Sequence, residues 1–235
     1  MPQVRAAEER TLEGNLRNSA GENAVLRVLG KLPVEKFHFA CSGGSDSMVF
    51  LDFLRHYPKN RFDVLHFNHG TQYCDEAENF VKAKCAEFGL ECRTGRITRK
   101  RARGESQEEY WRNERYDFFS LFKDAPIVTC HHLGDAVETW VMSSLHGEGK
   151  LIPYRNARYN IIRPFLCTPK SEIEDWADRH GVKYVTDGSN FDISLNRNFV
   201  RLKMMDLVHE INPGIEKTIA KKIREAYRES EAKEK

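Results

Sequence analysis

The chain has 235 residues, enough for one large α/β domain, alone or with a small appendage. Hydrophobic residues make up 40% of it, and 37 basic residues nearly balance 35 acidic ones, which leaves a net charge of +2. This composition is that of an ordinary globular protein rather than a disordered or fibrous one, and the net charge alone indicates no class of partner.

Up to about residue 145 the predicted elements alternate between helix and strand. In chain order we predict a polar extension (1–22), a helix (24–32), a strand (37–40), a helix (47–57), a strand (62–67), a helix (76–88), a strand (91–93), a helix (105–122), a strand (127–130) and a helix (135–145). The polar extension is either helical or disordered. The alternation predicts an α/β fold, with a mainly parallel sheet covered by helices on both faces.

The pattern changes after residue 149. We predict a short apolar segment (161–166), a helix over 169–180 capped by Thr168, a polar loop (184–192), and two helices over 195–210 and 215–228, followed by charged residues that fray. Three tryptophans in helices, Trp111, Trp140 and Trp176, are predicted to be core. The domain prediction is an extension (1–22), a catalytic domain (23–225) with a helical end from about residue 195, and a charged tail (226–235).

The six cysteines stand at positions 41, 74, 85, 92, 130 and 167, and no two of them form a C-x-x-C pair. This spacing argues against a zinc ribbon, an iron–sulfur site or a thioredoxin-type pair. No secretory signal and no apolar stretch long enough to cross a membrane is visible in the sequence. We therefore expect a reducing, cytoplasmic location without a membrane partner.

A glycine- and serine-rich turn lies between the strand over 37–40 and the helix that follows it. Its residues are Ser42, Gly43, Gly44, Ser45, Asp46 and Ser47. A strand-to-helix turn of this kind directs backbone N–H groups and the positive helix end at one spot, which suits a phosphate. A carboxylate in such a site repels phosphate unless a divalent cation intervenes, so Asp46 is predicted to bind Mg²⁺. The alternative is a turn that merely joins a strand to a helix.

Polar residues follow two other predicted strands. His66, Asn68 and His69 lie at the end of the strand over 62–67, and His131 and His132 follow the strand over 127–130. Ligands of such sheets bind at the carboxyl ends of the strands, so these residues are predicted to converge with the turn. Adjacent histidines on a strand point to opposite faces, which disfavours a shared metal ion.

Acids and arginines follow in the helices. Asp135 and Glu138 stand in the first turn of the helix over 135–145, where acids cap a helix. The alternative is that His131 and Asp135 face the nucleotide pocket. Arg197 and Arg201 lie one helical turn apart on one face, which suits a phosphate or carboxylate, or else pairs with surface acids. Asp187 and Asn190, in the predicted loop, are typical of an Asx-turn, and a turn is the favoured interpretation of this segment taken alone.

A basic stretch covers residues 93–103 and contains no acid. It is either a solvated loop or a contact for a phosphate backbone. Its candidate RNA-binding residues are Arg96, Arg99, Lys100, Arg101 and Arg103.

Taken in order, these motifs resemble the tRNA(Ile)-lysidine synthetase family of PP-loop ATP pyrophosphatases, whose fold is adenine nucleotide α-hydrolase-like. The turn resembles the PP-loop, and the resemblance continues through Phe67–Gly70, Ser106–Tyr116, His131–Thr139, Ile162–Phe165, Asp187–Asn190, Arg197–Arg201 and Glu210–Pro213. It covers roughly residues 24–225. The series after residue 187 is the most specific part, because many adenylating enzymes share a PP-loop.

The resemblance implies a ligase that uses ATP and Mg²⁺ to join free L-lysine to the wobble cytidine of tRNA(Ile). ATP adenylates the C2 oxygen with release of pyrophosphate, and the lysine amine then displaces AMP. The implied ATP-binding residues are those of the turn, and the implied catalytic residues are Asp46, His131, Asp135, Asn190 and Arg201. Arg112 and Glu138 are implied to bind lysine, and Arg197 together with the basic stretch is implied to bind the anticodon region of tRNA. A homodimer is a further expectation.

Two departures from the family pattern stand out. The family usually has an acid at the place of Gly134, and this chain ends where the catalytic domain of longer members ends, so we expect a short form without the C-terminal domains. The rival hypotheses are a PP-loop tRNA thiolase, which generally relies on paired cysteines or a cluster, and a nucleotide- or RNA-binding module without catalysis.

Overall fold

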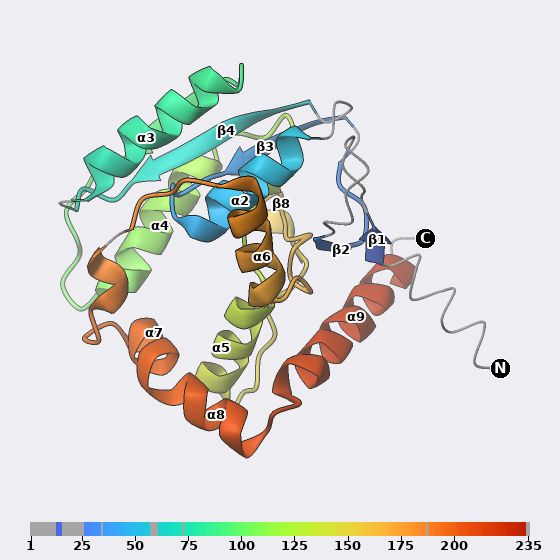
Figure 1. Ribbon diagram of the computed structural model, residues 1–235. Coiled ribbons are helices and arrows are strands. Elements are labelled where there is room, and N and C mark those ends of the chain that lie inside the picture. Colours follow the sequence, from blue (N-terminus) through green and yellow to red (C-terminus); the bar gives the residue numbers. More distant parts are fainter. Residues whose placement is uncertain are drawn as a thin grey trace.

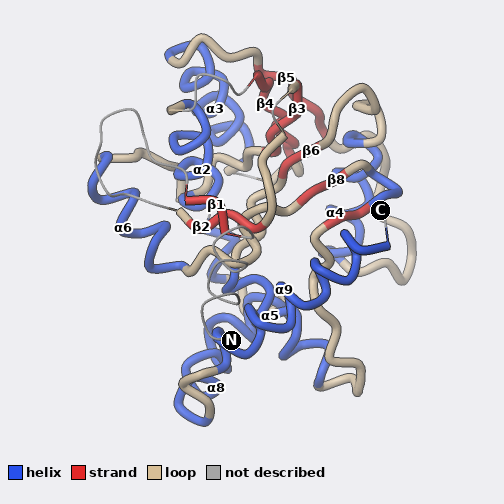
Figure 2. Tube along the Cα trace, turned by 90° about the vertical axis from the view of Figure 1, so that its right-hand side faces the viewer, coloured by secondary structure: helices blue, strands red, loops and turns tan. Residues whose placement is uncertain are grey.

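The computed structural model describes residues 13–15, 26–33, 35–56, 61–71, 73–186 and 188–233. Its centre is a six-stranded sheet in the order β5-β4-β3-β6-β8-β7. The strands are β3 (Lys36–Ala40), β4 (Arg61–Asn68), β5 (Cys92–Arg96), β6 (Ile127–Val128), β7 (Arg155–Asn156) and β8 (Ile161–Ile162). All neighbours pair in parallel except β7 and β8. Figure 2 shows most of these strands as a twisted row of red segments.

Eight α-helices and three shorter helical segments are described around the sheet (Figure 1). The helices are α2 (Ser45–Arg55), α3 (Cys74–Glu87), α4 (Gln107–Phe119), α5 (Leu133–Ser144), α6 (Lys170–His180), α7 (Asn196–Phe199), α8 (Met205–Ile211) and α9 (Ile215–Lys233). The shorter segments are η1 (Ala157–Tyr159), η2 (Gly188–Phe191) and η3 (Val200–Met204), the last being π-helical. No helix in the described ranges is long and apolar enough to span a membrane.

Alternation along the strands divides the core into two layers, because successive side chains point to opposite faces. Phe37, Phe39 and Val64 face a large cluster formed with α2, α3, α5, α6 and α9. Their neighbour Leu65 and the β6 residue Ile127 face a smaller cluster with Tyr116 and Phe119 of α4. Both faces are therefore buried, which confirms the predicted sheet with helices on both faces.

The strand order reverses between β3 and β6, the two central strands. From β3 the chain proceeds outward to β4 and β5 and then returns to β6 on the other side of β3. Ligands of open parallel sheets bind at such a reversal, beyond the carboxyl ends of the strands. The turn after β3 and the two histidines after β6 lie at this place.

Several predictions of local structure were wrong. Residues 27–29 form strand β2 (Arg27–Leu29), paired antiparallel with β1 (Glu13–Asn15), where we predicted a helix over 24–32. Proline 169, rather than Thr168, caps α6, and the Thr168 hydroxyl donates instead to the carbonyl of Arg27. The predicted helix over 195–210 is divided into α7, η3 and α8.

The ends of the chain also differ in detail from the prediction. Helix α9 continues to Lys233, into the segment that we expected to be a charged tail, because Tyr227 is buried against Tyr154. Of the three tryptophans, Trp176 is fully buried, whereas Trp111 and Trp140 are partly exposed. Most of the predicted polar extension lies outside the described residues.

Candidate functional site

A cavity of about 760 Å³ lies beyond the carboxyl ends of β3, β4 and β6. Its wall includes the turn after β3, the histidines after β4 and β6, and side chains from α4, α5, α6, η2, α7 and η3. A cavity of this size accommodates a nucleotide-sized ligand. The structure therefore brings together the motifs that the sequence placed at separate strand ends.

The turn is shaped by the buried hydroxyl of Ser47. This oxygen accepts hydrogen bonds from the backbone N–H groups of Ser42 (3.2 Å) and Gly43 (3.1 Å) and donates to the carbonyl of Gly44 (3.0 Å). Gly43 has a φ of +90°, a value that side chains disfavour, and a Cβ there would lie 3.2 Å from Val81 of α3. Ser47 and Gly43 thus hold the loop against α3, and the N-terminal end of α2 faces the cavity.

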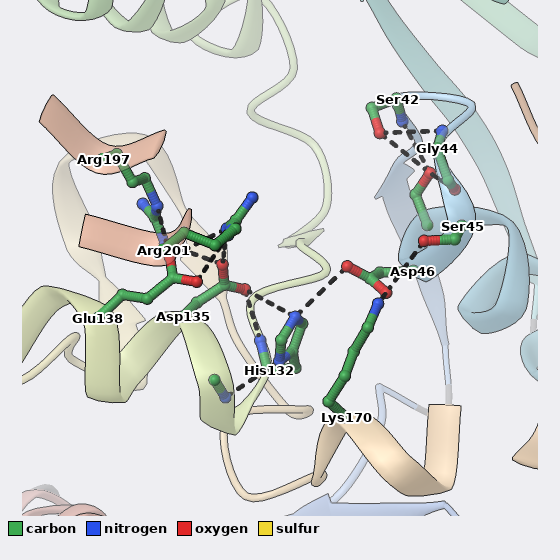
Figure 3. A network of polar contacts seen from close by, with 12 residues as sticks. Ser42, Gly44, Ser45, Asp46, His132, Asp135, Glu138, Lys170, Arg197 and Arg201 are labelled. Carbon is green, nitrogen blue, oxygen red and sulfur yellow. Dashed lines mark hydrogen bonds and ion pairs between the residues drawn. The ribbon is translucent and has the colours of Figure 1, made fainter. Parts of the chain in front are cut away.

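Asp46, in the first turn of α2, is held by two partners (Figure 3). Lys170, the first residue of α6, forms an ion pair with its Oδ1 atom, and Nε2 of His132 lies 3.3 Å from Oδ2. Burial raises the pKa of Asp46, but the hydrogen bond and charge of His132 and the charge of Lys170 outweigh it and hold the pKa at about 2. Asp46 is thus an ionised carboxylate on the cavity wall, as an Mg²⁺ ligand must be. Sequence reasoning missed Lys170.

His132 caps helix α5 as well as contacting Asp46. The ring Nδ1 of His132 accepts a hydrogen bond from the backbone N–H of Gly134 (3.1 Å), and the backbone N–H of His132 donates one to Oδ2 of Asp135 (3.0 Å). A Cβ on Gly134 would lie only 2.8 Å from Cε1 of His132. Glycine at 134, the position where the chain departs from the family pattern, therefore leaves room for the imidazole that reaches Asp46.

The other end of the cavity holds two acids from α5 and two arginines from α7 and η3. Arg197 pairs with Asp135 (2.8 Å) and Glu138 (3.1 Å). Arg201 pairs with Glu138 through Nε (2.7 Å) and lies 3.5 Å from Asp135. We call these four residues the charge cluster; Figure 3 shows them beside the His132–Asp46–Lys170 contacts. The arginines share one helical face, as predicted, and their acids line the cavity.

The electrostatic balance within the charge cluster favours ionised groups. Burial raises the pKa of Asp135, but the charges of His132 and Arg197 bring it below the ordinary value. Burial lowers the pKa of Arg201, but its hydrogen bond to Glu138 and the nearby acids leave it raised overall. A buried pair of this kind is costly to break by removing one partner.

Three histidines line the sheet side of the cavity. Burial lowers the pKa of His69 and of His131 to about 3, so both are neutral at physiological pH. His131 shares a hydrogen bond with the Thr129 hydroxyl (2.9 Å). Within the described residues, Nε2 of His66 and Nδ1 of His69 are buried without a hydrogen-bond partner.

Arginines of α4 divide between the cavity and the surface. Arg115 lines the cavity, and burial lowers its pKa. Arg112, the residue expected to bind lysine, is exposed, and its guanidinium lies 4.7 Å from the ring centroid of Tyr116. Of these two arginines, Arg115 lies on the cavity wall, and the lysine-binding role of Arg112 stays a prediction.

The loop that contains Asn190 passes over the PP-loop region. The N–H of Val185 donates to the carbonyl of Gly43 (3.0 Å), and Asn190, in η2, lies on the cavity wall. Asp187 lies outside the described residues, as does the side chain of Ser189.

The basic stretch is partly neutralised within the fold. Arg96 pairs with Asp75 and Glu78, and Arg99 pairs with Glu105 and Glu114. Lys100, Arg101 and Arg103 are exposed in the loop that precedes α4. Of the basic stretch, these last three residues are best placed to contact an anionic group of a binding partner.

The described residues include one group of three potential metal ligands, Asp52, His56 and His180. It lies outside the cavity and contains no cysteine. Asp52 is already engaged by Arg55 (2.7 Å) and by the indole N–H of Trp176 (2.9 Å), so these contacts account for its burial.

Comparisons with known proteins agree with this geometry. A tRNA(Ile)-lysidine synthase from Thermotoga sp. (strain RQ2) is 32% identical over 193 residues, which cover 77% of this chain and 47% of the relative. One from Nitrosomonas europaea is 31% identical over 202 residues, covering 80% and 44%. The chain thus spans about half the length of these curated relatives.

Among solved structures, a U34-tRNA thiolase from Methanococcus maripaludis, described with its [4Fe–4S] cluster, matches with a TM-score of 0.66 at 16% identity. The match covers 97% of this chain and 78% of the thiolase, and it shows a likeness in fold alone. The model of one sequence family, described as a PP-loop domain, matches residues 18–208. The match includes the turn, the charge cluster and Lys170, and the chain belongs to the PP-loop domain family.

Proposed function

We propose that this chain uses ATP to attach lysine to the wobble cytidine of tRNA(Ile). The observation that carries the proposal is that one cavity joins a PP-loop with an ionised carboxylate to the charge cluster. The similarity to lysidine synthases over 77–80% of the chain supports the choice of reaction.

In the first step the cytidine C2 oxygen attacks the α-phosphorus of ATP. The new O–P bond replaces the bond between the α-phosphorus and the bridging oxygen, and pyrophosphate leaves. The N-terminal end of α2 and the turn bind the phosphates. Asp46 would hold Mg²⁺, which when bound neutralises phosphate charge and polarises the phosphoryl group. We expect the base of the nucleotide to lie near His66 and His69, which line the cavity.

In the second step the neutral ε-amine of lysine attacks C2 of the adenylated cytidine. The C2–O bond breaks, AMP leaves, and the amine gives up a proton to solvent as the C–N bond forms. The acids of the charge cluster can accept hydrogen bonds from the α-ammonium of a zwitterionic amino acid, and Arg115, on the same cavity wall, can donate to its α-carboxylate. We assign the ammonium to Glu138 and the carboxylate to Arg115. His131, Asp135, Asn190 and Arg201 position the cytidine and the amine.

Sulfur transfer is the rival chemistry on this fold. It needs cysteine thiolates, yet burial raises the pKa of Cys41 to about 11 and that of Cys130 well above its usual value. Both cysteines line the cavity, and their surroundings favour the unreactive thiol form.

The test is an incubation of the protein with labelled lysine, ATP, Mg²⁺ and unmodified tRNA(Ile). We expect label in the RNA only when ATP is present and cytidine occupies the wobble position. A matched transcript with uridine there is the control. An isolated anticodon stem-loop shows whether the chain needs the rest of the tRNA. The absence of label from every tRNA in a complete pool would contradict the proposal.

A further inference from the structure

Lys170 has no role in the two steps of the proposed reaction. It begins α6, a helix from the C-terminal part of the chain, and its ammonium contacts Oδ1 of Asp46 at the beginning of α2. Figure 3 shows its side chain extending to Asp46, with His132 on the other side of the carboxylate. The contact joins two helices that begin at the phosphate end of the cavity.

The ammonium and a divalent cation compete for the same carboxylate. His132 lies 3.3 Å from Oδ2, so the oxygen opposite to it, Oδ1, is the one that Lys170 contacts. Two cations in contact with one oxygen repel each other strongly. Binding of a divalent cation to Asp46 through Oδ1 therefore displaces the ammonium.

A displaced Lys170 has an anionic group within reach. The side chain is 39% exposed, so it is not confined by packing, and its four-carbon stem is flexible. Phosphates bound at the N-terminal end of α2 lie beside Asp46, because that residue belongs to the first turn of the helix. A lysine ammonium is a common point-charge ligand for phosphate.

We propose that Lys170 is a pyrophosphate-binding residue that exchanges its partner. Its ammonium passes from Asp46 to the β- and γ-phosphates when the divalent cation binds Asp46, and it then stabilises the pyrophosphate leaving group. This proposal rests on the cleavage of ATP between the α- and β-phosphates that the proposed function requires. His132 retains its contact with Oδ2 and keeps the carboxylate in place during the exchange.

The experiment measures binding without RNA or lysine. Calorimetry gives the affinity for pyrophosphate in the presence of Mg²⁺ for the parent chain and for Lys170→Met, Lys170→Arg and Lys183→Met. Lys183 is an exposed lysine just beyond the same helix and serves as the control. We expect Lys170→Met to weaken pyrophosphate binding at least about tenfold, Lys170→Arg by no more than about threefold, and Lys183→Met not at all.

A second measurement tests the competition directly. Electron paramagnetic resonance follows the binding of Mn²⁺, as a substitute for Mg²⁺, to the protein alone. Lys170→Met should tighten Mn²⁺ binding and Asp46→Asn should remove it. The thermal unfolding of each variant reports whether it is folded. If Lys170→Met does not fold, Lys170→Gln takes its place in both measurements.

The outcomes separate this inference from the proposed function. Unchanged pyrophosphate affinity in folded Lys170→Met would overturn the leaving-group role, and unchanged Mn²⁺ affinity would overturn the competition. If the parent chain transfers no lysine to RNA but both shifts are observed, the role of Lys170 stands and the choice of acceptor is wrong.

Discussion

The two ends of the cavity are built in different ways. The phosphate end depends on consecutive residues, Ser42 to Ser47, whose turn conformation is largely fixed by their own hydrogen bonds. The charge cluster instead joins residues that are about sixty positions apart, such as Glu138 and Arg201. His132 connects the ends, because it contacts both Asp46 and Asp135.

This difference indicates that the two ends of the cavity have separate roles. A contiguous loop that binds phosphate is compatible with many adenylating reactions, since it contacts only the group that all of them share. A cluster assembled from α5, α7 and η3 depends on the C-terminal part of the fold and is free to select the second substrate. The π-helical segment η3 places Arg201 in that cluster, as such segments often do at functional sites.

Removal of the carboxylate at the phosphate end should have the largest effect. Asp46→Ala loses the proposed ligand of Mg²⁺ and leaves Lys170 without its partner, and we expect a fall of roughly a thousandfold or more in the rate of adenylation. Exchange of labelled pyrophosphate into ATP, with RNA present, measures it. An alanine variant as active as the parent would exclude a role for Asp46 in metal binding.

The two arginines of α4 offer a matched pair. Arg115→Met should weaken lysine binding by roughly 10- to 100-fold, because it removes a charged hydrogen-bond donor from the cavity wall. Arg112→Met removes an exposed guanidinium that covers Tyr116 and should change the KM for lysine by less than about twofold. Steady-state kinetics with varied lysine decide between them. The reverse order would restore Arg112 as the lysine ligand.

The link between the ends depends on Gly134. Gly134→Ala places a methyl group against the ring of His132 and should displace the imidazole from Asp46, at a cost of about 1–3 kcal/mol in stability. The chemical shifts and titration of His132, followed by NMR, report the displacement. Titration of His132 as in the parent would show that the ring tolerates the methyl group and that the glycine is not required.

The exposed part of the basic stretch should have the smallest effect on chemistry. Replacement of Lys100, Arg101 and Arg103 by glutamine should weaken RNA binding and lower the slope of log affinity against log salt by about 2. The same change at Arg96 and Arg99 should mainly reduce stability, because these arginines pair with acids of the fold. Filter binding at several salt concentrations separates the two sets.

The sequence predicted what local patterns determine. The strand–turn–helix unit of Ser42–Ser47, the parallel sheet and the shared face of Arg197 and Arg201 are confirmed, since each depends on short-range spacing. It did not predict Lys170, because nothing near that residue indicates that α6 begins beside Asp46. Pairing with the preceding strand β1 also made residues 27–29 extended, although Leu26, Val28 and Leu29 fit a helical stripe.

The site was predictable in type but not in its contacts. Sequence spacing placed Glu138 in the first turns of a helix, yet only the fold shows that its partners are Arg197 and Arg201. The same applies to the basic stretch, where acids from α3 and α4 neutralise two arginines that look free in the sequence.

The division between a phosphate end and a lysine end is tested most directly by Glu138→Gln. This substitution keeps the side-chain shape and removes one charge of the charge cluster. Pyrophosphate exchange and lysine transfer are measured on the same preparation with the same RNA. If the ends act separately, exchange stays within about threefold of the parent while lysine transfer falls at least about 100-fold. An equal loss of both activities, or an unchanged transfer of lysine, would contradict the division between a phosphate end and a lysine end.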